Sequence, residues 1–99
     1  STPYFFRMYR RIDKALRFPK KLALALEQGD LLLAFELDAA GRVHSLRVSK
    51  GSGFREFDRE ALRAFRQAAP FGAVPPELMK SRDRMSVIAP YYFRNPLIR

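Results

Sequence analysis

The sequence predicts an α+β fold, in which two main helices cover one face of a three-stranded antiparallel sheet with strand order 2-1-3. Two observations predict this fold. The apolar spacing changes from three or four residues to strict alternation at Asp30, and it becomes helical again after Gly53. A last alternating segment contains Pro90, which has no N–H to donate and therefore indicates an edge strand. At 99 residues, we expect residues 1–99 to form a single domain.

The first helix is predicted over about residues 4–17. Apolar side chains recur along it at helical spacing, at Phe5, Met8, Ile12 and Leu16, and basic residues fill the other side. Phe18-Pro19 ends this helix because the proline ring clashes with a helical residue before it. Residues 20–28 predict a short second helical segment, with Gly29 as its left-handed cap.

A hairpin follows, with strands over about residues 30–38 and 42–49. In the first strand the apolar residues Leu31, Leu33, Phe35 and Leu37 share one face. Asp38 and Gly41 are typical turn residues between the two strands. In the second strand Val43 is out of phase with Leu46 and Val48, which predicts a bulge near the turn.

The second main helix is predicted over about residues 57–68. Its inward side chains are Phe57, Ala61, Ala64, Phe65 and Ala68, and its outer face carries a stripe of Arg59, Arg63 and Arg66. Pro70 and Val74-Pro75-Pro76 predict an irregular extended connection. The third strand covers about residues 85–93, and a right-handed crossover lays it beside the first strand.

The net charge of +9, from 19 Lys and Arg against 10 Asp and Glu, suits a polyanionic partner or a solvated basic surface. The longest apolar runs have five residues, whereas a membrane-spanning helix needs about 20. No signal peptide is evident, so we expect any anchor or export signal to lie outside this chain. The chain contains no cysteine, which is compatible with either an oxidising compartment such as the periplasm or a reducing one.

The sequence offers no catalytic or metal-binding constellation, so we expect neither an enzyme nor a cofactor. His44 is the only histidine, and no nucleophile and orienting group stand at a spacing that would complete a relay. One histidine without cysteines does not make a metal site. Gly51-Ser52-Gly53 lacks the lysine and the spacing of a phosphate-binding loop.

The ordered motifs of the chain, from Phe18 to Phe93, resemble the C-terminal domain of TonB-like energy transducers, with TolA-type domains as structural relatives. The matching pieces are Phe18-Pro19 ten residues before Gly29, the turn Leu37-Asp38-Ala39-Ala40-Gly41-Arg42-Val43, the loop Val48–Gly53, Phe57-Asp58 and Ala61, Ala69-Pro70-Phe71 with Pro75-Pro76, and Ala89-Pro90-Tyr91-Tyr92-Phe93. Two features depart from the family pattern, the higher charge and Lys50-Gly51 where paired serines are usual.

The resemblance implies a non-enzymatic periplasmic module, tethered to the inner membrane by a segment outside this chain, that binds an outer-membrane receptor or another envelope partner in a transport or motility machine. It implies that the partner adds a strand along Val87, Ile88, Ala89, Pro90, Tyr91, Tyr92 and Phe93. Arg59, Arg63 and Arg66 would steer the encounter. The same edge could pair with a second copy of the chain in a homodimer.

Two alternatives stay open at this point. A small basic nucleic-acid-binding domain would use the net charge of +9 and the stripe of Arg59, Arg63 and Arg66. A membrane-surface domain would have only residues 4–17 as its amphipathic helix. Neither alternative is the expected function, and no nucleic acid is expected as the partner.

Overall fold

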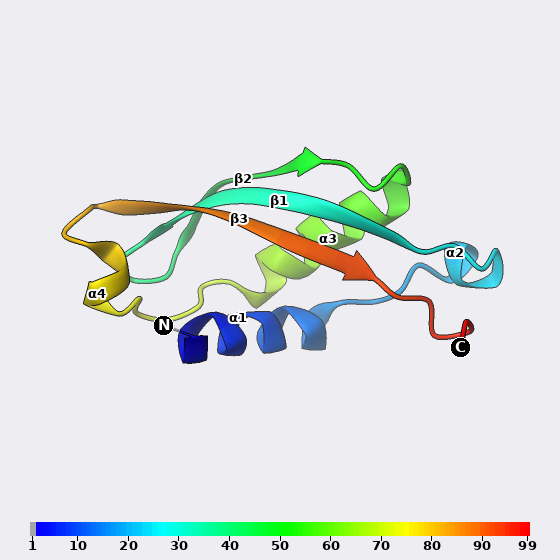
Figure 1. Cartoon of the computed structure of the whole chain (residues 1–99), viewed down its shortest axis with the longest axis horizontal. Coiled ribbons are helices and arrows are strands. Elements are labelled where there is room, and N and C mark those ends of the chain that lie inside the picture. The colour runs from blue at the N-terminus through cyan, green and yellow to red at the C-terminus, as the bar shows by residue number, and fades with distance from the viewer. Residues whose placement is uncertain (1) are drawn as a thin grey trace.

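The structure is a computed structural model that describes residues 2–99. Its elements are α1 (Thr2–Ala15), α2 (Lys20–Leu24), β1 (Gly29–Asp38), β2 (Val43–Lys50), α3 (Arg55–Ala68), α4 (Pro76–Met79) and β3 (Arg84–Phe93). The strands form one antiparallel sheet in the order β2-β1-β3, as predicted, and the two long helices α1 and α3 lie on one side of it (Figure 1). The molecule is elongated, with extents of 46 × 22 × 19 Å.

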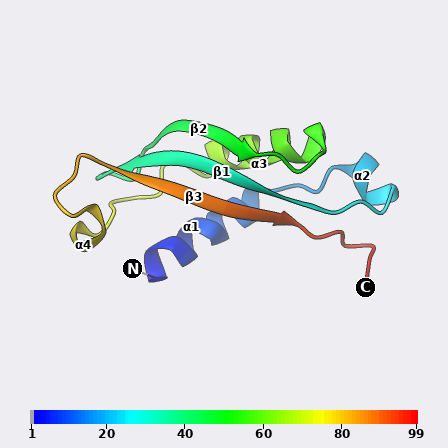
Figure 2. The ribbon, with the colours of Figure 1, turned by 45° about the horizontal axis from the view of Figure 1, so that its top comes forward.

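The core lies between this sheet and the helices α1 and α3 (Figure 2). The alternation predicted for the central strand is confirmed, because Leu31, Leu33, Phe35 and Leu37 are all buried. The inward face predicted for α3 is confirmed as well, since its buried residues are Phe57, Ala61, Ala64, Phe65 and Ala68. The amphipathic patterns therefore determine which face of each element meets the core.

The bulge predicted near the hairpin turn is confirmed. Arg47 pairs with Ala34, and His44 pairs with Glu36. The chain therefore advances three residues on β2 where it advances two on β1, which leaves one extra residue on β2. Ser45 lies inside this bulge with a left-handed φ of 56°. A second register shift separates the pairs of Leu32 and Leu33. The strand β2 is therefore irregular along its length.

The ends of the first two helices differ from the prediction. α1 ends at Ala15 and α2 ends at Leu24. Leu26, and not Gly29, takes the left-handed conformation, with φ 58°. The N–H of Glu27 then bonds the carbonyl of Leu22 at 3.0 Å, as in a Schellman cap.

Gly29 has a different role, because it begins β1. A Cβ at this position would lie 3.2 Å from the ring of Phe57. The glycine therefore allows strand and helix to approach closely, and it does not supply a positive φ.

The connection between α3 and β3 also differs from the prediction of an irregular extended segment. Residues Pro76–Met79 form one short helix, α4, with proline at its start, where the missing N–H has no intrahelical partner to lose. Met79 is buried, and Lys80 and Ser81 take left-handed φ values of 52° and 61°. These two residues reverse the chain into β3.

Candidate functional site

The sheet has two outer strands, β2 and β3, and only β3 has a regular outer edge. Its pairing with β1 runs without a register shift from Gly29 opposite Phe93 to Asp38 opposite Arg84. In the described part of the chain no further strand lies beyond β3 (Figure 1). A long regular edge is the feature to which an extended peptide can add as a strand.

Pro90 shows which backbone groups of β3 point outward. It lies opposite Leu32 in this uninterrupted ladder. Because proline has no N–H, its place in a regular ladder fits a position whose backbone groups point away from β1. Alternation then turns the backbone groups of Ser86, Ile88 and Tyr92 outward too. The free edge therefore offers N–H donors at Ile88 and Tyr92, with no donor at Pro90 between them.

The predicted partner-binding residues separate into two groups in the structure. Ile88, Pro90 and Tyr92 are exposed, and the side chains of Ile88 and Tyr92 are 65% and 58% accessible. Val87 is half-buried, whereas Ala89, Tyr91 and Phe93 belong to the core. Only the exposed group can meet a partner with its side chains.

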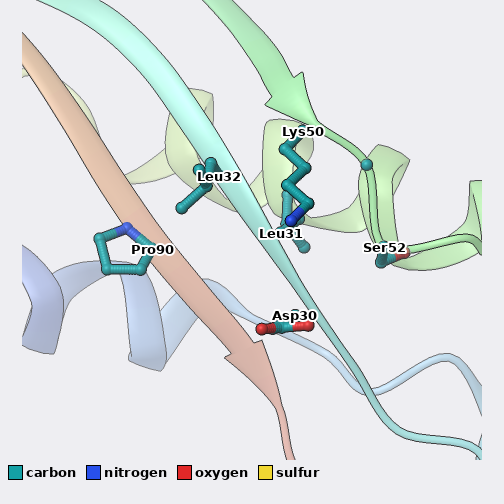
Figure 3. A pocket seen from close by; sticks show the side chains of 7 residues that line it. Asp30, Leu31, Leu32, Lys50, Ser52 and Pro90 are labelled. Atoms are coloured by element: carbon teal, nitrogen blue, oxygen red, sulfur yellow. The ribbon is translucent and has the colours of Figure 1, made fainter.

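A hollow of about 190 Å³ adjoins this group on the sheet face that has no helix over it (Figure 3). It is lined by Asp30, Leu31, Leu32, Lys50, Gly51, Ser52 and Pro90, which come from all three strands and the loop after β2. Figure 3 shows Leu32 and Pro90 side by side with Lys50 across from them. Pro90 thus belongs both to the free edge and to the wall of the hollow.

Tyr91 fastens β3 to α1 from the core side. Its hydroxyl donates a hydrogen bond to the carboxylate of Asp13, and its ring lies 6.4 Å from the ring of Tyr9. Burial and, after it, the bond to Asp13 raise the pKa of Tyr91 above its usual range. The hydroxyl therefore stays protonated and able to donate.

Three rings from separate motifs pack together at the end of β3. Phe57 stacks on Phe93 at a centroid distance of 4.5 Å, and Phe18 meets their edges at 5.3 and 6.0 Å. Offset and edge-on pairs of this kind are the favoured arrangements of aromatic rings. The aromatic positions of the sequence motifs thus build the support beneath the free edge.

The carboxylate of Asp38 holds the hairpin turn. It accepts hydrogen bonds from the backbone N–H groups of Ala40 and Arg42, from Arg42 Nε and from His44 Nε2, at 2.9–3.0 Å. The bond from His44 is the largest cause that lowers the pKa of Asp38 far below its usual range. His44 therefore has a partner within the turn.

The predicted steering residues do not form one uniform stripe. Arg63 bonds Glu60, Gln67 and the carbonyl of Ala15 at 2.6–2.7 Å, and so joins α3 to α1. Burial raises the pKa of Glu60, but hydrogen bonds from Arg63 and the backbone of Arg17 outweigh it and lower the pKa. Arg59 and Arg66 are exposed and outside the four ion pairs found between described residues.

Sequence reasoning missed Asn95, which is 1% exposed just after β3. Its Nδ2 donates to the carbonyls of Ala23 and Glu27 at 3.2 and 3.0 Å, and its backbone N–H donates to Gln28 Oε1 at 2.9 Å. Asn95 thereby fixes the end of β3 against the end of α2. No local pattern in the sequence distinguishes such a residue from a surface asparagine.

Within residues 2–99, no helix has the length and apolar character required to cross a bilayer. In the same range, no three His, Cys, Asp or Glu side chains gather as metal ligands would.

Comparison with known proteins gives consistent results. The family model described as Gram-negative bacterial TonB protein C-terminal matches residues 14–94. Protein TonB of Pasteurella multocida is 36% identical over 72 residues, which are 73% of this chain and 28% of that protein. Protein TonB of Pseudomonas putida is 33% identical over 84 residues, which are 85% of this chain and 34% of that protein. The chain therefore spans about a third of the length of these relatives.

The fold has a counterpart among solved structures. The solution NMR structure of the Helicobacter pylori TonB C-terminal domain superposes with a TM-score of 0.76 and covers 94% of this chain and 95% of its own. The two sequences are 20% identical, so this likeness concerns the fold. It includes the three-stranded antiparallel sheet with order 2-1-3.

Proposed function

This chain belongs to the family of Gram-negative bacterial TonB C-terminal domains, and from this premise we propose that it is the periplasmic, partner-binding domain of a TonB-type energy transducer. The observation that carries the proposal is the regular, uncovered edge of β3, with outward N–H groups at Ile88 and Tyr92. The partner is an outer-membrane receptor or another component of the cell envelope.

In this proposal an extended segment of the partner adds to the sheet as a fourth strand. Its backbone bonds the outward groups of β3, and each such bond contributes about 0.5–1.5 kcal/mol. The exposed side chains of Ile88 and Tyr92 give the segment an apolar surface to cover. The support beneath β3, from Tyr91 with Asp13 and from Phe93 with Phe57, keeps the edge straight before the partner arrives.

Two further parts of the proposal concern the surroundings of the domain. Family membership supports a periplasmic location and a tether to the inner membrane through a segment outside residues 1–99. The exposed Arg59 and Arg66 would steer an acidic partner toward the domain, with Arg63 tied to Glu60.

A role in nucleic-acid binding is less well supported. The stripe that motivates it is interrupted, because the guanidinium of Arg63 is bonded to Glu60, Gln67 and Ala15. Tyr92 is the only exposed aromatic side chain on β3, and one ring is a poor platform for stacked bases.

The test uses Ile88, whose N–H points outward. In Ile88→Pro that donor is lost while the ladder to β1 keeps its own bonds, so the domain should fold with an unchanged circular dichroism spectrum. We expect affinity for extended segments of the outer-membrane receptors of the same organism to fall about tenfold, which corresponds to one hydrogen bond. Amide NMR titration of the ¹⁵N-labelled domain would report affinity and site together. Ile88→Val, which keeps the N–H, should bind as the unmodified chain does.

Two results would count against strand addition. One is that Ile88→Pro binds as tightly as Ile88→Val. The other is that the segments shift the amide signals of α1 or α3 and leave residues 87–93 unchanged. Self-association through β3 would appear in sedimentation velocity as a dimer that Ile88→Pro abolishes.

A further inference from the structure

The outward side of α1 carries a basic face made of Arg7, Arg10, Arg11 and Lys14. Their spacing of three, four and seven residues places them in one row along the helix, which spans about 10 Å at 1.5 Å per residue. All four are exposed, and they alone line a hollow of about 230 Å³. The neighbouring side of the helix is buried through Tyr4, Met8 and Ile12.

Nothing in the described part of the chain neutralises this basic face. None of its four side chains has a carboxylate oxygen within 4.0 Å in residues 2–99. The only acidic residue of α1, Asp13, accepts the hydroxyl of Tyr91. Like charges four residues apart on a helix repel each other, so the row of cations costs helix stability. The row reaches beyond α1 at Arg11, whose guanidinium lies 5.9 Å from the centre of the Phe71 ring.

An exposed aromatic ring lies beside the basic face. Phe6 is 59% accessible, whereas Tyr4 and Met8, two residues before and after it in the same helix, are buried. The guanidinium of Arg10 lies 5.8 Å from the centre of its ring. A large apolar side chain next to cations on the water side of a helix is typical of helices that lie on a membrane surface.

The family match does not account for this helix face, because it begins at residue 14 and leaves Phe6, Arg7, Arg10 and Arg11 outside. The face is also separate from the proposed partner site. α1 lies on one side of the sheet (Figure 2), whereas the hollow beside Pro90 opens on the other side (Figure 3). A ligand on α1 would leave that site accessible.

We propose that the basic face of α1 docks on an anionic phospholipid surface, with lipid phosphates between its four cations and the ring of Phe6 in the interface. Charge complementarity favours this occupant, because a flat array of phosphates can meet a straight row of cations all at once. Each basic residue held near an anionic membrane strengthens binding about fivefold. One aromatic ring adds apolar contact, and together they give peripheral, salt-sensitive binding. The proposal goes beyond partner binding at β3.

The first experiment is flotation of the 99-residue chain with vesicles at about 0.15 M salt, a salt level at which exposed charges are screened beyond about 8 Å. We expect binding to vesicles of phosphatidylcholine with phosphatidylglycerol and none to phosphatidylcholine alone. The variant R7Q/R10Q/R11Q/K14Q should lose binding. Its control, K21Q/R47Q/R55Q/K80Q, removes the same charge from exposed residues outside the ion pairs and should still float.

A second experiment places a reporter on the face itself. The chain contains no tryptophan, so Phe6→Trp introduces a single tryptophan, whose emission can be excited apart from that of the four tyrosines. We expect its emission to shift to the blue with the anionic vesicles and to stay unchanged with phosphatidylcholine vesicles or inorganic phosphate. Tyr92→Trp, on the other side of the sheet, should not shift. These readings need no charge-removing variant and remain valid if the fourfold variant fails to fold.

Three results would overturn the proposal. One is equal loss of flotation in both fourfold variants, which would show an effect of net charge alone. Another is an unshifted Phe6→Trp emission on vesicles to which the protein is bound. The third is tight binding of a short DNA duplex through the same four residues at about 0.15 M salt, with no binding to anionic vesicles, which would assign the face to nucleic acid.

Discussion

At the scale of single residues, Asn95 shows how one buried polar side chain can join two elements. Carbonyls at the end of a helix have no partner within the helix. Nδ2 of Asn95 donates to the carbonyl of Ala23 in the last turn of α2 and to that of Glu27 beyond the helix, and Oδ1 accepts the N–H of Leu97 at 2.8 Å. The chain after β3 is thereby held against α2.

We therefore predict that Asn95→Ala lowers the free energy of unfolding by about 1–3 kcal/mol, since it removes the hydrogen bonds of a buried side chain and takes the donor from the half-buried carbonyl of Glu27. Asn95→Asp should cost more, because it places a charge opposite carbonyl oxygens. Urea denaturation followed by circular dichroism measures both. Ser86→Ala, at an exposed position, should stay within about 0.5 kcal/mol. An Asn95→Ala variant as stable as Ser86→Ala would show that water satisfies the carbonyls.

Asp38 leads to a prediction about acid stability. Hydrogen bonds from His44 and from the turn backbone lower its pKa below the unfolded value of about 3.9. The stability that it contributes is therefore present above about pH 4 and is lost as the pH falls further. In Asp38→Asn the free energy of unfolding should be lower at pH 7 and should fall less steeply between about pH 4 and pH 2. Asp83→Asn, in an exposed loop, should keep the steep dependence.

At the scale of elements, α1 and β3 are joined through the hydroxyl of Tyr91 and the carboxylate of Asp13. Tyr91→Phe should lower the free energy of unfolding by about 1 kcal/mol, because Asp13 is exposed and water replaces the lost donor. The raised pKa of Tyr91 gives a second readout. Its contribution is full below about pH 10 and is lost above it, so Tyr91→Phe should show a weaker loss of stability between about pH 9 and pH 11.

The matched control for this pair is Tyr92→Phe, because Tyr92 is exposed on the same strand. It should leave both the stability and its alkaline pH dependence unchanged. If Tyr91→Phe behaves like Tyr92→Phe, the link to α1 does not contribute to stability, and packing of α1 through Met8 and Ile12 is sufficient.

The sequence predicted the long elements because the spacing of apolar residues within each element reveals both its type and the face that it buries. The same logic located the bulge, since Val43 is out of phase with Leu46. Local patterns could not locate α4. Proline interrupts a helix, but it is also favoured at the first position of one, and Pro76 has that second role. Local patterns also misassigned the cap of α2 to Gly29, whose small size serves a contact with Phe57 from a distant helix.

The candidate site shows the same limit. Alternation along β3 and the position of Pro90 predicted an edge strand, and the right-handed crossover rule then predicted its place in the sheet. Alternation also predicts Tyr91 and Phe93 in the core and Tyr92 outside, which the structure confirms, but it does not show that Val87 is half-buried. Nor could the spacing of Arg59, Arg63 and Arg66 show that Arg63 bonds the carbonyl of Ala15 in α1, because that contact joins residues 48 positions apart.

At the scale of the whole molecule, the net charge of +9 divides into groups with different consequences. The basic face of α1 forms one group, on a helix that is mostly outside the family match. Arg59 and Arg66 form another, on α3. A third group is held in ion pairs with carboxylates, which offset its charge, so it adds little to the electrostatic field around the molecule. Its members are Arg42, Arg63 and Arg84.

This division predicts how charge affects the rate of partner binding. Two charges about 10 Å from an acidic partner in water attract it by about 0.8 kcal/mol together, so R59Q/R66Q should slow association about fourfold at low salt. Dissociation should not change, because neither side chain lies on β3. Stopped-flow or surface plasmon resonance measurements with a receptor segment would separate the two rates, and the difference should vanish as ionic strength rises.

Arg63→Gln is the informative comparison, because it removes the same kind of charge from the same helix. It also breaks the bonds to Glu60 and to the carbonyl of Ala15, so the free energy of unfolding should fall as well. R59Q/R66Q should leave that free energy within about 0.5 kcal/mol. If R59Q/R66Q instead speeds dissociation and leaves association unchanged, the two arginines touch the bound partner directly. In that case the partner extends over α3, and strand addition at β3 is only part of the interface.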